Sequence, residues 1–190
     1  FSANRVYGAS VITALTAQNT MGVTGVHDVP PDFVLAQIDA VFSDLNVAAV
    51  KIGMLSQTRI IKAVASGLEK HSAKNIVLDP VMVATSGDPL LAEDAVSAIQ
   101  EWLIPMADLI TPNLHEAAKL TGLPLATDEA QMRKQAKAIT ESGASAVLIK
   151  GGHAGASESA DLLHNGSLSN WYRAARVETR NTHGTGCSLS

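Results

Sequence analysis

Short apolar segments alternate with segments of helical periodicity along nearly the whole chain. Residues 49–55 (AVKIGML), 75–81 (NIVLDPV) and 146–152 (AVLIKGG) are short and apolar, as strands buried on both faces of a sheet are. Between such segments apolar side chains recur every three or four residues, for example from Val34 to Leu45. This alternation predicts an α/β fold with a mostly parallel central sheet.

The same patterns place the remaining elements. The β-branched, apolar run over 6–17 predicts a buried central strand, and Asn165-Gly166 is typical of a hairpin turn. The further strands are expected over 108–111, 161–164 and 171–177. Helices are expected over 61–68, 95–103 and 132–139. Two further helices are expected to start at Pro30-Pro31 and at Asn113. Residues 82–91 are expected to form a loop.

Charge and composition exclude several classes of function. The chain has 14 Lys and Arg against 18 Asp and Glu, a net charge of −4, so it lacks the basic surface that nucleic acids and anionic membranes require. The uncharged run over 6–26 contains Gln18, Asn19 and several threonines and is too polar to cross a bilayer. We therefore expect neither a nucleic-acid partner nor a membrane partner.

The cysteine count suggests the cellular compartment of the protein, and the two ends of the chain suggest its domain organisation. Cys187 is the only cysteine, which excludes an internal disulfide and a cysteine-built zinc site and favours a cytoplasmic location. Residues 1–190 read as a single domain. The chain lacks an initial methionine and stops where the sequence predicts the start of a helix, so we expect this domain to be truncated at both ends.

Ligands of open α/β sheets bind beyond the carboxyl ends of the strands. The familiar nucleotide motifs are absent there: the sequence has no G-x-x-x-x-G-K-[ST], and GTGCSL lacks the third glycine of G-x-G-x-x-G. There is also no G-x-S-x-G nucleophile turn. A P-loop site, a dinucleotide site and a serine hydrolase are therefore not supported.

The segment NTHGTGC is the most informative strand end. Gly184 and Gly186 at a helix start let backbone N–H groups converge, and such a turn favours an anion such as a phosphate. Cys187 in the first turn of that helix is a candidate proton acceptor, because a helix N-terminus favours the thiolate. The alternatives are an ordinary glycine turn and a buried structural cysteine.

Three other strand ends carry charged side chains. Lys150 ends an apolar strand, where its cation would steady a transferring phosphate or would simply extend to solvent. Asp79 follows NIVL and suits Mg²⁺ held through water. Asn113 and Glu116 have the spacing of a capping box, which is the structural alternative to a role in a site.

Taken together, SVITALTAQNT, VKIGMLS, VLDPVMVATSGDPLL, LITPNLHEAAKLTG, LIKGGH and NTHGTGCSLS resemble the hydroxymethylpyrimidine/phosphomethylpyrimidine kinases of thiamine biosynthesis, in the ribokinase-like superfamily. The resemblance covers essentially all 190 residues in order. It implies a three-layer fold with helices on both faces of the sheet. It also implies that MgATP phosphorylates 4-amino-5-hydroxymethyl-2-methylpyrimidine and then phosphorylates the monophosphate to the diphosphate.

The resemblance also implies roles for individual residues. Gln18 would recognise the pyrimidine, with Thr16 and Met54 lining its pocket. The anion hole would be NTHGTGC, with Gly184, Gly186 and the base Cys187. The residues near ATP and its magnesium would be Lys150, Asn113, Thr182 and Thr185 for the nucleotide and Asp79 and Glu116 for Mg²⁺.

Two other functions stay open at this point. Pyridoxal kinases of the same superfamily phosphorylate a similar alcohol, although the TAQNT and KIGML segments favour the pyrimidine. A catalytically silent pyrimidine-binding domain is the alternative outside the enzymes. The family pattern also includes a first strand with a GGAG-type turn, which this chain lacks, and a homodimer is a family-level expectation.

Overall fold

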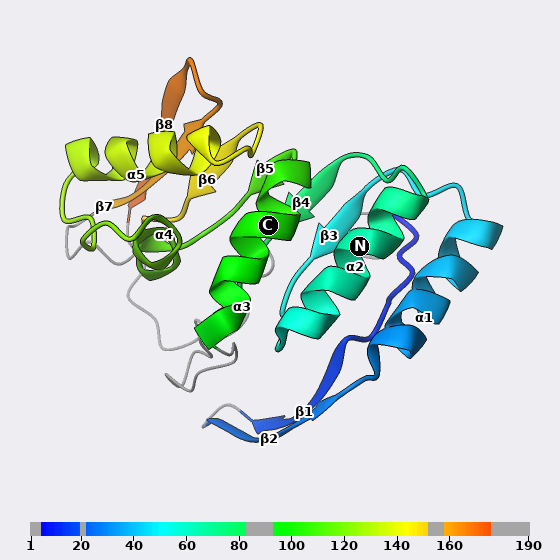
Figure 1. The fold of residues 1–190 in the computed structure, drawn as a ribbon. Coiled ribbons are helices and arrows are strands. Elements are labelled where there is room, and N and C mark those ends of the chain that lie inside the picture. The colour runs from blue at the N-terminus through cyan, green and yellow to red at the C-terminus, as the bar shows by residue number, and fades with distance from the viewer. Residues whose placement is uncertain (1–4, 20–21, 83–92, 152–157, 176–190) are drawn as a thin grey trace.

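The structure is a computed structural model that describes residues 5–19, 22–82, 93–151 and 158–175 (Figure 1). Its strands are β1 (Ala14–Asn19), β2 (Gly22–Asp28), β3 (Val50–Ile52), β4 (Ile76–Leu78), β5 (Leu109–Ile110), β6 (Val147–Ile149), β7 (Glu158–His164) and β8 (Ser169–Ala175). Its helices are α1 (Pro31–Asp44), α2 (Thr58–Lys70), α3 (Glu93–Ala98), α4 (Leu114–Thr121) and α5 (Glu129–Glu141), with a π-turn over Ile99–Leu103 and a 3-10 turn over Ile104–Met106.

Six strands form the main sheet in the order β3-β4-β5-β6-β7-β8. The pairs from β3 to β6 are parallel, and β6-β7 and β7-β8 are antiparallel. Because the four parallel strands follow one another in chain order, right-handed connections place their helices on the same face of the sheet. The sheet is therefore mostly parallel, as expected, and Figure 1 shows α2, α3 and α5 in front of the strands, which is one of the two helix layers that the resemblance implies.

The core lies between this sheet and its helices. One face of the strands is fully buried, at Ile52, Leu78, Ile110 and Ile149, each no more than 5% exposed. Side chains on the opposite face, such as Leu148, are only half-buried in the described part of the chain. The alternation of burial along each strand therefore identifies the helix-covered face.

The structure corrects the prediction of a buried central strand over 6–17. Residues 6–13 form no strand, and β1 pairs antiparallel with β2 in a separate two-stranded sheet. We call these two strands the ribbon. Its side chains are mostly exposed, since Thr16, Gln18 and Asn19 interrupt the apolar pattern that a strand buried on both faces needs.

The other predicted elements in the described residues are confirmed, with shorter parallel strands and with β7 longer than the expected strand over 161–164. The hairpin forms, and the Asn165 side chain accepts a hydrogen bond from the N–H of Leu168 at 2.8 Å while Gly166 adopts a positive φ of 84°. The helix expected over 95–103 ends in a π-turn instead of continuing as an α-helix. Parts of the expected loop over 82–91 and of the strand over 171–177 lie outside the described residues.

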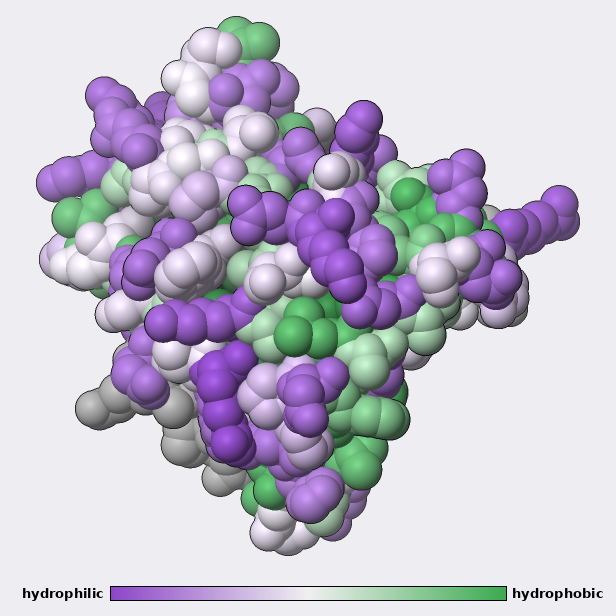
Figure 2. Space-filling model, turned by 45° about the vertical axis from the view of Figure 1, so that its right-hand side comes forward, coloured by the Kyte–Doolittle hydropathy of each residue, from purple (hydrophilic) through white to green (hydrophobic). Residues whose placement is uncertain are grey.

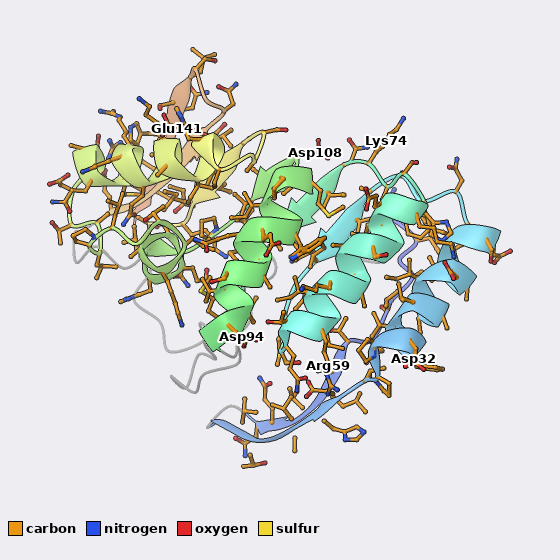
Figure 3. All side chains as sticks on the ribbon, in the orientation of Figure 1. Asp32, Arg59, Lys74, Asp94, Asp108 and Glu141 are labelled. Atoms are coloured by element: carbon orange, nitrogen blue, oxygen red, sulfur yellow. The ribbon has the colours of Figure 1, made fainter. Side chains whose placement is uncertain are left out.

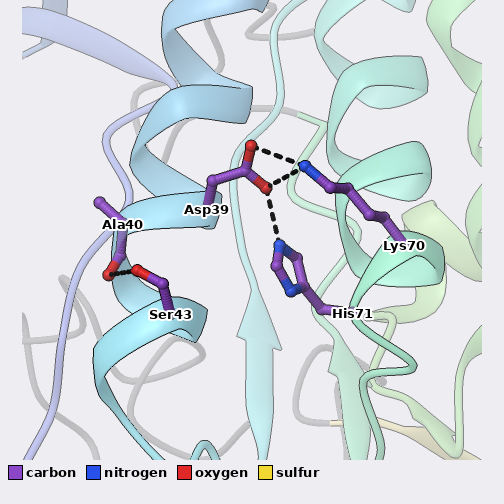
Figure 4. Close-up of polar contacts among 5 residues, drawn as sticks. All are labelled: Asp39, Ala40, Ser43, Lys70 and His71. Atoms are coloured by element: carbon purple, nitrogen blue, oxygen red, sulfur yellow. Dashed lines mark hydrogen bonds and ion pairs between the residues drawn. The ribbon is translucent and has the colours of Figure 1, made fainter.

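Helices α1 and α2 are joined on the surface by a polar cluster (Figure 4). The Asp39 carboxylate accepts hydrogen bonds from Lys70 Nζ at 2.8 Å and lies 2.7 Å from His71 Nε2. The His71 ring stacks on Phe42, with centroids 4.8 Å apart. The hydrogen bonds from Lys70 and His71 lower the pKa of Asp39 below its ordinary value.

No helix in the described ranges has the length and apolar character that crossing a bilayer requires.

Candidate active site

The candidate site lies at the edge of the main sheet where the parallel strands end. Figure 3 shows Lys74 and Asp108, which precede β4 and β5, at the edge opposite to Arg59 and Asp94, which lie in the first turns of α2 and α3. Arg59 and Asp94 therefore mark the carboxyl edge of the parallel strands. The ribbon extends from this same edge (Figure 1).

The centre of the site is an ion pair between the ends of two strands. Asp79 follows β4 and is 2% exposed, and its Oδ1 lies 3.0 Å from Nζ of Lys150, which follows β6. The Thr111 hydroxyl, at the end of β5 and fully buried, donates to the same oxygen at 3.3 Å. Lys150 is thus directed at a buried carboxylate, and the alternative of a lysine extending to solvent is wrong.

Asn113 and Glu116 form the capping box that their spacing predicts. Asn113 Oδ1 accepts from the Glu116 N–H at 2.9 Å, and Glu116 Oε2 accepts from the Asn113 N–H at 2.8 Å. Asn113 also forms a parallel β-bridge with Lys150, so the capped end of α4 lies beside the ion pair. The structural alternative is confirmed, and the same geometry brings Glu116 to the site.

Burial raises the pKa of the Glu116 carboxyl above its ordinary value of 4.5, and the N–H of Asn113 and the charge of Lys150 partly oppose that rise. The side chain is only 7% exposed. A carboxyl in these surroundings holds its proton at a higher pH than a carboxyl in solvent does.

Replacing Glu116 with glutamine should make the protein more stable relative to wild type as the pH rises. Between pH 4.5 and the raised pKa, folded wild type binds more protons than the unfolded chain does, so its free energy of unfolding falls across that window. Glutamine does not titrate, and its Oε1 preserves the capping box. Urea unfolding of both proteins from pH 4 to pH 8 measures the difference.

The matched control for this substitution is Glu101→Gln, which removes an exposed carboxylate of the neighbouring π-turn. Its stability difference from wild type should change little with pH. A difference for Glu116→Gln that is equally constant over this range would contradict the raised pKa.

Gly151 lets the end of β6 approach β7 closely. A Cβ added at Gly151 would lie 1.9 Å from the carbonyl oxygen of Ala160, and the Gly151 N–H donates to Asp161 Oδ1 at 2.8 Å. The backbone that carries Lys150 is therefore fixed by a contact that only glycine permits.

Gly151→Ala should lower the free energy of unfolding by about 1–3 kcal/mol, the usual cost of overpacking a tight contact. Gly53→Ala is the matched control, because a Cβ added there meets nothing within 4 Å. Thermal unfolding of both variants measures this loss of stability. Equal melting temperatures would show that the backbone after β6 accommodates the methyl group without loss of stability.

The three residues that the resemblance assigns to the pyrimidine lie around the ribbon. Thr16 and Gln18 are both in β1, and the Thr16 hydroxyl donates to Gln18 Oε1 at 3.3 Å. Met54 follows β3, and its carbonyl accepts from the Thr13 hydroxyl at 3.1 Å. Asp79 is adjacent to that strand, since its N–H donates to the Ile52 carbonyl at 2.8 Å. The structure brings Thr16 to Gln18 and the base of the ribbon to Met54.

The remaining predicted residues are Thr182, Gly184, Thr185, Gly186 and Cys187, and all of them lie outside the described residues.

The oxygen donors near Asp79 suit a magnesium ion that is held mainly through water and phosphate. Mg²⁺ in phosphoryl-transfer sites is bound by one or two carboxylates, and Asp79 and Glu116 supply two beside the Lys150 cation. In the described part of the chain no group of three His, Cys, Asp or Glu side chains could form a protein-built cage. The donor set therefore fits Mg²⁺ bound together with a phosphate ligand.

Sequence reasoning missed two contributors at this edge. Thr111 was treated only as a strand residue, although a hydroxyl before Pro112 at a strand end was a usable signal. Asp28, at the end of β2, accepts hydrogen bonds from the side chains of Ser56 and Gln57. No local pattern in the sequence pointed to that contact, because the partners are nearly thirty residues away.

Comparisons with known proteins give a consistent result. The family model described as phosphomethylpyrimidine kinase matches residues 1–190. The hydroxymethylpyrimidine/phosphomethylpyrimidine kinase of Rhizobium meliloti (strain 1021) is 59% identical over 190 residues, which are 100% of this chain and 71% of that protein.

Two solved structures have the same fold. The phosphomethylpyrimidine kinase of Clostridium difficile 630 superposes with a TM-score of 0.83 at 42% identity and covers 90% of this chain and 73% of its own. An ADP complex of Bacillus subtilis pyridoxal kinase superposes with a TM-score of 0.87 at 32% identity, and the match covers 97% of this chain and 70% of that one. These similarities confirm the ribokinase-like α/β fold class.

Proposed function

Because the chain belongs to the phosphomethylpyrimidine kinase family, we propose that it phosphorylates 4-amino-5-hydroxymethyl-2-methylpyrimidine with ATP and then converts the monophosphate to the diphosphate for thiamine biosynthesis. Residues 1–190 act as one kinase domain in this proposal. The location is cytoplasmic, which the single cysteine favours.

The observation that carries the proposal is the buried Asp79–Lys150 pair, which has Glu116 and Asn113 beside it at the carboxyl ends of β4, β5 and β6. Phosphoryl transfer needs groups that hold the phosphates in position and offset negative charge, and needs little covalent chemistry from the protein. The Lys150 ammonium is a positively charged group held in position, and the two carboxylates are ligands for the magnesium that would offset the remaining phosphate charge.

The residues of this cluster have distinct roles. The Lys150 ammonium contacts the phosphates of ATP and stabilises the transferred charge, and Asn113 contributes to nucleotide binding. Asp79 and Glu116 hold magnesium through its waters. When bound, Mg²⁺ neutralises phosphate charge.

The pyrimidine is bound between the ribbon and the loop after β3. Gln18 offers both a donor and an acceptor to an aminopyrimidine edge, Thr16 adjusts the orientation of that amide, and Met54 forms an adaptable apolar wall. Support for this arrangement is the hydrogen bond from Thr13 to the Met54 carbonyl, which places the base of the ribbon next to Met54.

The turn NTHGTGC provides the anion hole in this proposal. In this role the backbone N–H groups of Gly184 and Gly186 would donate hydrogen bonds to the phosphate oxygens on which charge develops, and Thr182 and Thr185 would contribute to nucleotide binding. Cys187 assists removal of the proton from the hydroxymethyl group. Near-normal turnover of Cys187→Ala would refute that last role.

A pyridoxal kinase is the second candidate, because the Bacillus subtilis pyridoxal kinase superposes with a TM-score of 0.87. The deciding experiment measures ADP formation with MgATP and each alcohol in turn. We expect kcat/KM to be higher for the hydroxymethylpyrimidine than for pyridoxal. The reverse order would favour the pyridoxal kinase, and pyrimidine binding without ADP formation would indicate a silent domain.

We also propose that the protein forms a homodimer through its N-terminal region. Six of the ten exposed large apolar side chains in the described residues are Val6, Tyr7, Ile12, Leu15, Val26 and Phe33. Figure 2, in which the side of the molecule that carries α1 comes forward, shows apolar surface between strongly polar patches. Light scattering at micromolar concentration tests the proposal, and a mass of one chain would overturn it.

A further inference from the structure

The position of the ribbon depends on contacts at its base. Strands β1 and β2 pair only with each other in the described part of the chain, and most of their side chains are exposed. An isolated pair of strands is marginally stable at best in water. The groups that attach the ribbon to the rest of the molecule therefore decide where Thr16 and Gln18 lie.

Among the described residues, side chains at three positions contribute to these attachments. The side chain of Gln37 in α1 accepts a hydrogen bond from the Ile12 N–H at 2.9 Å and donates one to the Ile12 carbonyl at 3.0 Å. The Thr13 hydroxyl donates to the Met54 carbonyl. The third side chain is Asp28, which is the last residue of β2. Asp28 is the only charged one of the three.

Both oxygens of the Asp28 carboxylate are used. Its Oδ1 accepts from the hydroxyl of Ser56, which is 8% exposed, and its Oδ2 accepts from Nε2 of Gln57. The amide of Gln57 is itself oriented, because Arg59 Nε donates to its Oε1 at 2.6 Å. Hydrogen bonds to a carboxylate are about twice as strong as neutral ones, so this contact is the strongest of the three attachments.

Ser56 and Gln57 belong to the short loop that joins β3 to α2, and Met54 lies two residues before Ser56 in the same loop. The carboxylate thus connects the end of the ribbon to the segment that provides the apolar wall of the proposed pyrimidine pocket. A shift of Asp28 would change the separation between the two sides of that pocket.

We propose that Asp28 is a positioning residue, which holds the ribbon with Thr16 and Gln18 against the loop with Met54 and so sets the affinity for the pyrimidine. The inference rests on the proposed function. Asp28 touches no reacting atom, and it acts through Ser56 and Gln57.

The test is Asp28→Asn, which removes the negative charge and one acceptor oxygen, so that the new side chain has a single oxygen where the carboxylate accepts from both Ser56 and Gln57. We expect KM for the pyrimidine to rise roughly tenfold, because a hydrogen bond to a charged group is lost, while kcat and KM for ATP change less than about twofold. Adding Gln57→Glu should restore KM, since the new amide then donates to a carboxylate. Asp32→Asn, which removes an exposed charge in the first turn of α1, is the matched control and should leave KM unchanged.

Hydrogen exchange supplies a readout that does not depend on the substrate. The amides of β2 should exchange faster in Asp28→Asn than in wild type, and the Gln57→Glu addition should restore their protection. If the wild type phosphorylates no pyrimidine, the proposed function fails, and the exchange data still decide whether Asp28 holds the ribbon. Unchanged exchange, equal losses in KM and kcat, or no restoration by Gln57→Glu would overturn the inference.

Discussion

Replacing Lys150 with methionine should lower the free energy of unfolding by roughly 3–5 kcal/mol, because the substitution removes the cation from a buried ion pair. Asp79 is 2% exposed and Lys150 14%, so water cannot replace the lost charge. The Thr111 hydroxyl still donates to Asp79, but it carries no charge. Urea unfolding at pH 7 measures the loss.

A double variant separates the lost pairing from other effects of the methionine. Lys150→Met with Asp79→Asn removes both charges of the pair and should recover much of the stability, since neither partner is then left charged and unpaired. Lys74→Met, on the opposite edge of the sheet and exposed, is the control and should change stability little. If the double variant is as unstable as Lys150→Met alone, the stability does not come from the ion pair.

Lys150→Met should also lower kcat by roughly 100-fold or more, the usual effect of removing a group that stabilises charge in a transition state. The Kd for the pyrimidine should change little, because the ribbon and Met54 form that part of the site. Turnover is measured per folded molecule, with the folded fraction taken from circular dichroism of the same sample. The pyrimidine Kd is measured by titration calorimetry.

Lys150→Arg is the companion variant for turnover, because it keeps the charge in a different geometry. It should retain more activity than Lys150→Met. Equal losses in kcat and in pyrimidine affinity for Lys150→Met would contradict a role confined to the phosphates.

Local patterns predicted most of the fold. The repeat from Val34 to Leu45 identified α1, and Asn165-Gly166 identified the β7-β8 hairpin, since both signals depend only on neighbouring residues. The run over 6–17 was misassigned for the same reason. Its composition suits a strand, but whether a strand is buried depends on its partners, and β1 pairs only with β2 among the described strands.

The sequence pointed to individual residues of the candidate site, but it did not predict the contacts between them. Asp79, Glu116 and Lys150 were each identified as charged groups at strand ends. Their grouping follows from the sheet order, and no local pattern reveals it because Asp79 and Lys150 are 71 positions apart in the sequence. The contacts of Thr111 and Asp28 were missed because they also join segments that are distant in the sequence.

The central claim is that this site transfers a phosphoryl group twice, first to the hydroxymethyl group of the pyrimidine and then to the phosphate of the resulting monophosphate. The most direct measurement supplies the protein with MgATP and the pyrimidine monophosphate and follows the products by ³¹P NMR. The account predicts that a pyrimidine diphosphate and ADP form in equal amounts. ATP consumption without the diphosphate, or no consumption in a protein that binds both substrates, would contradict it.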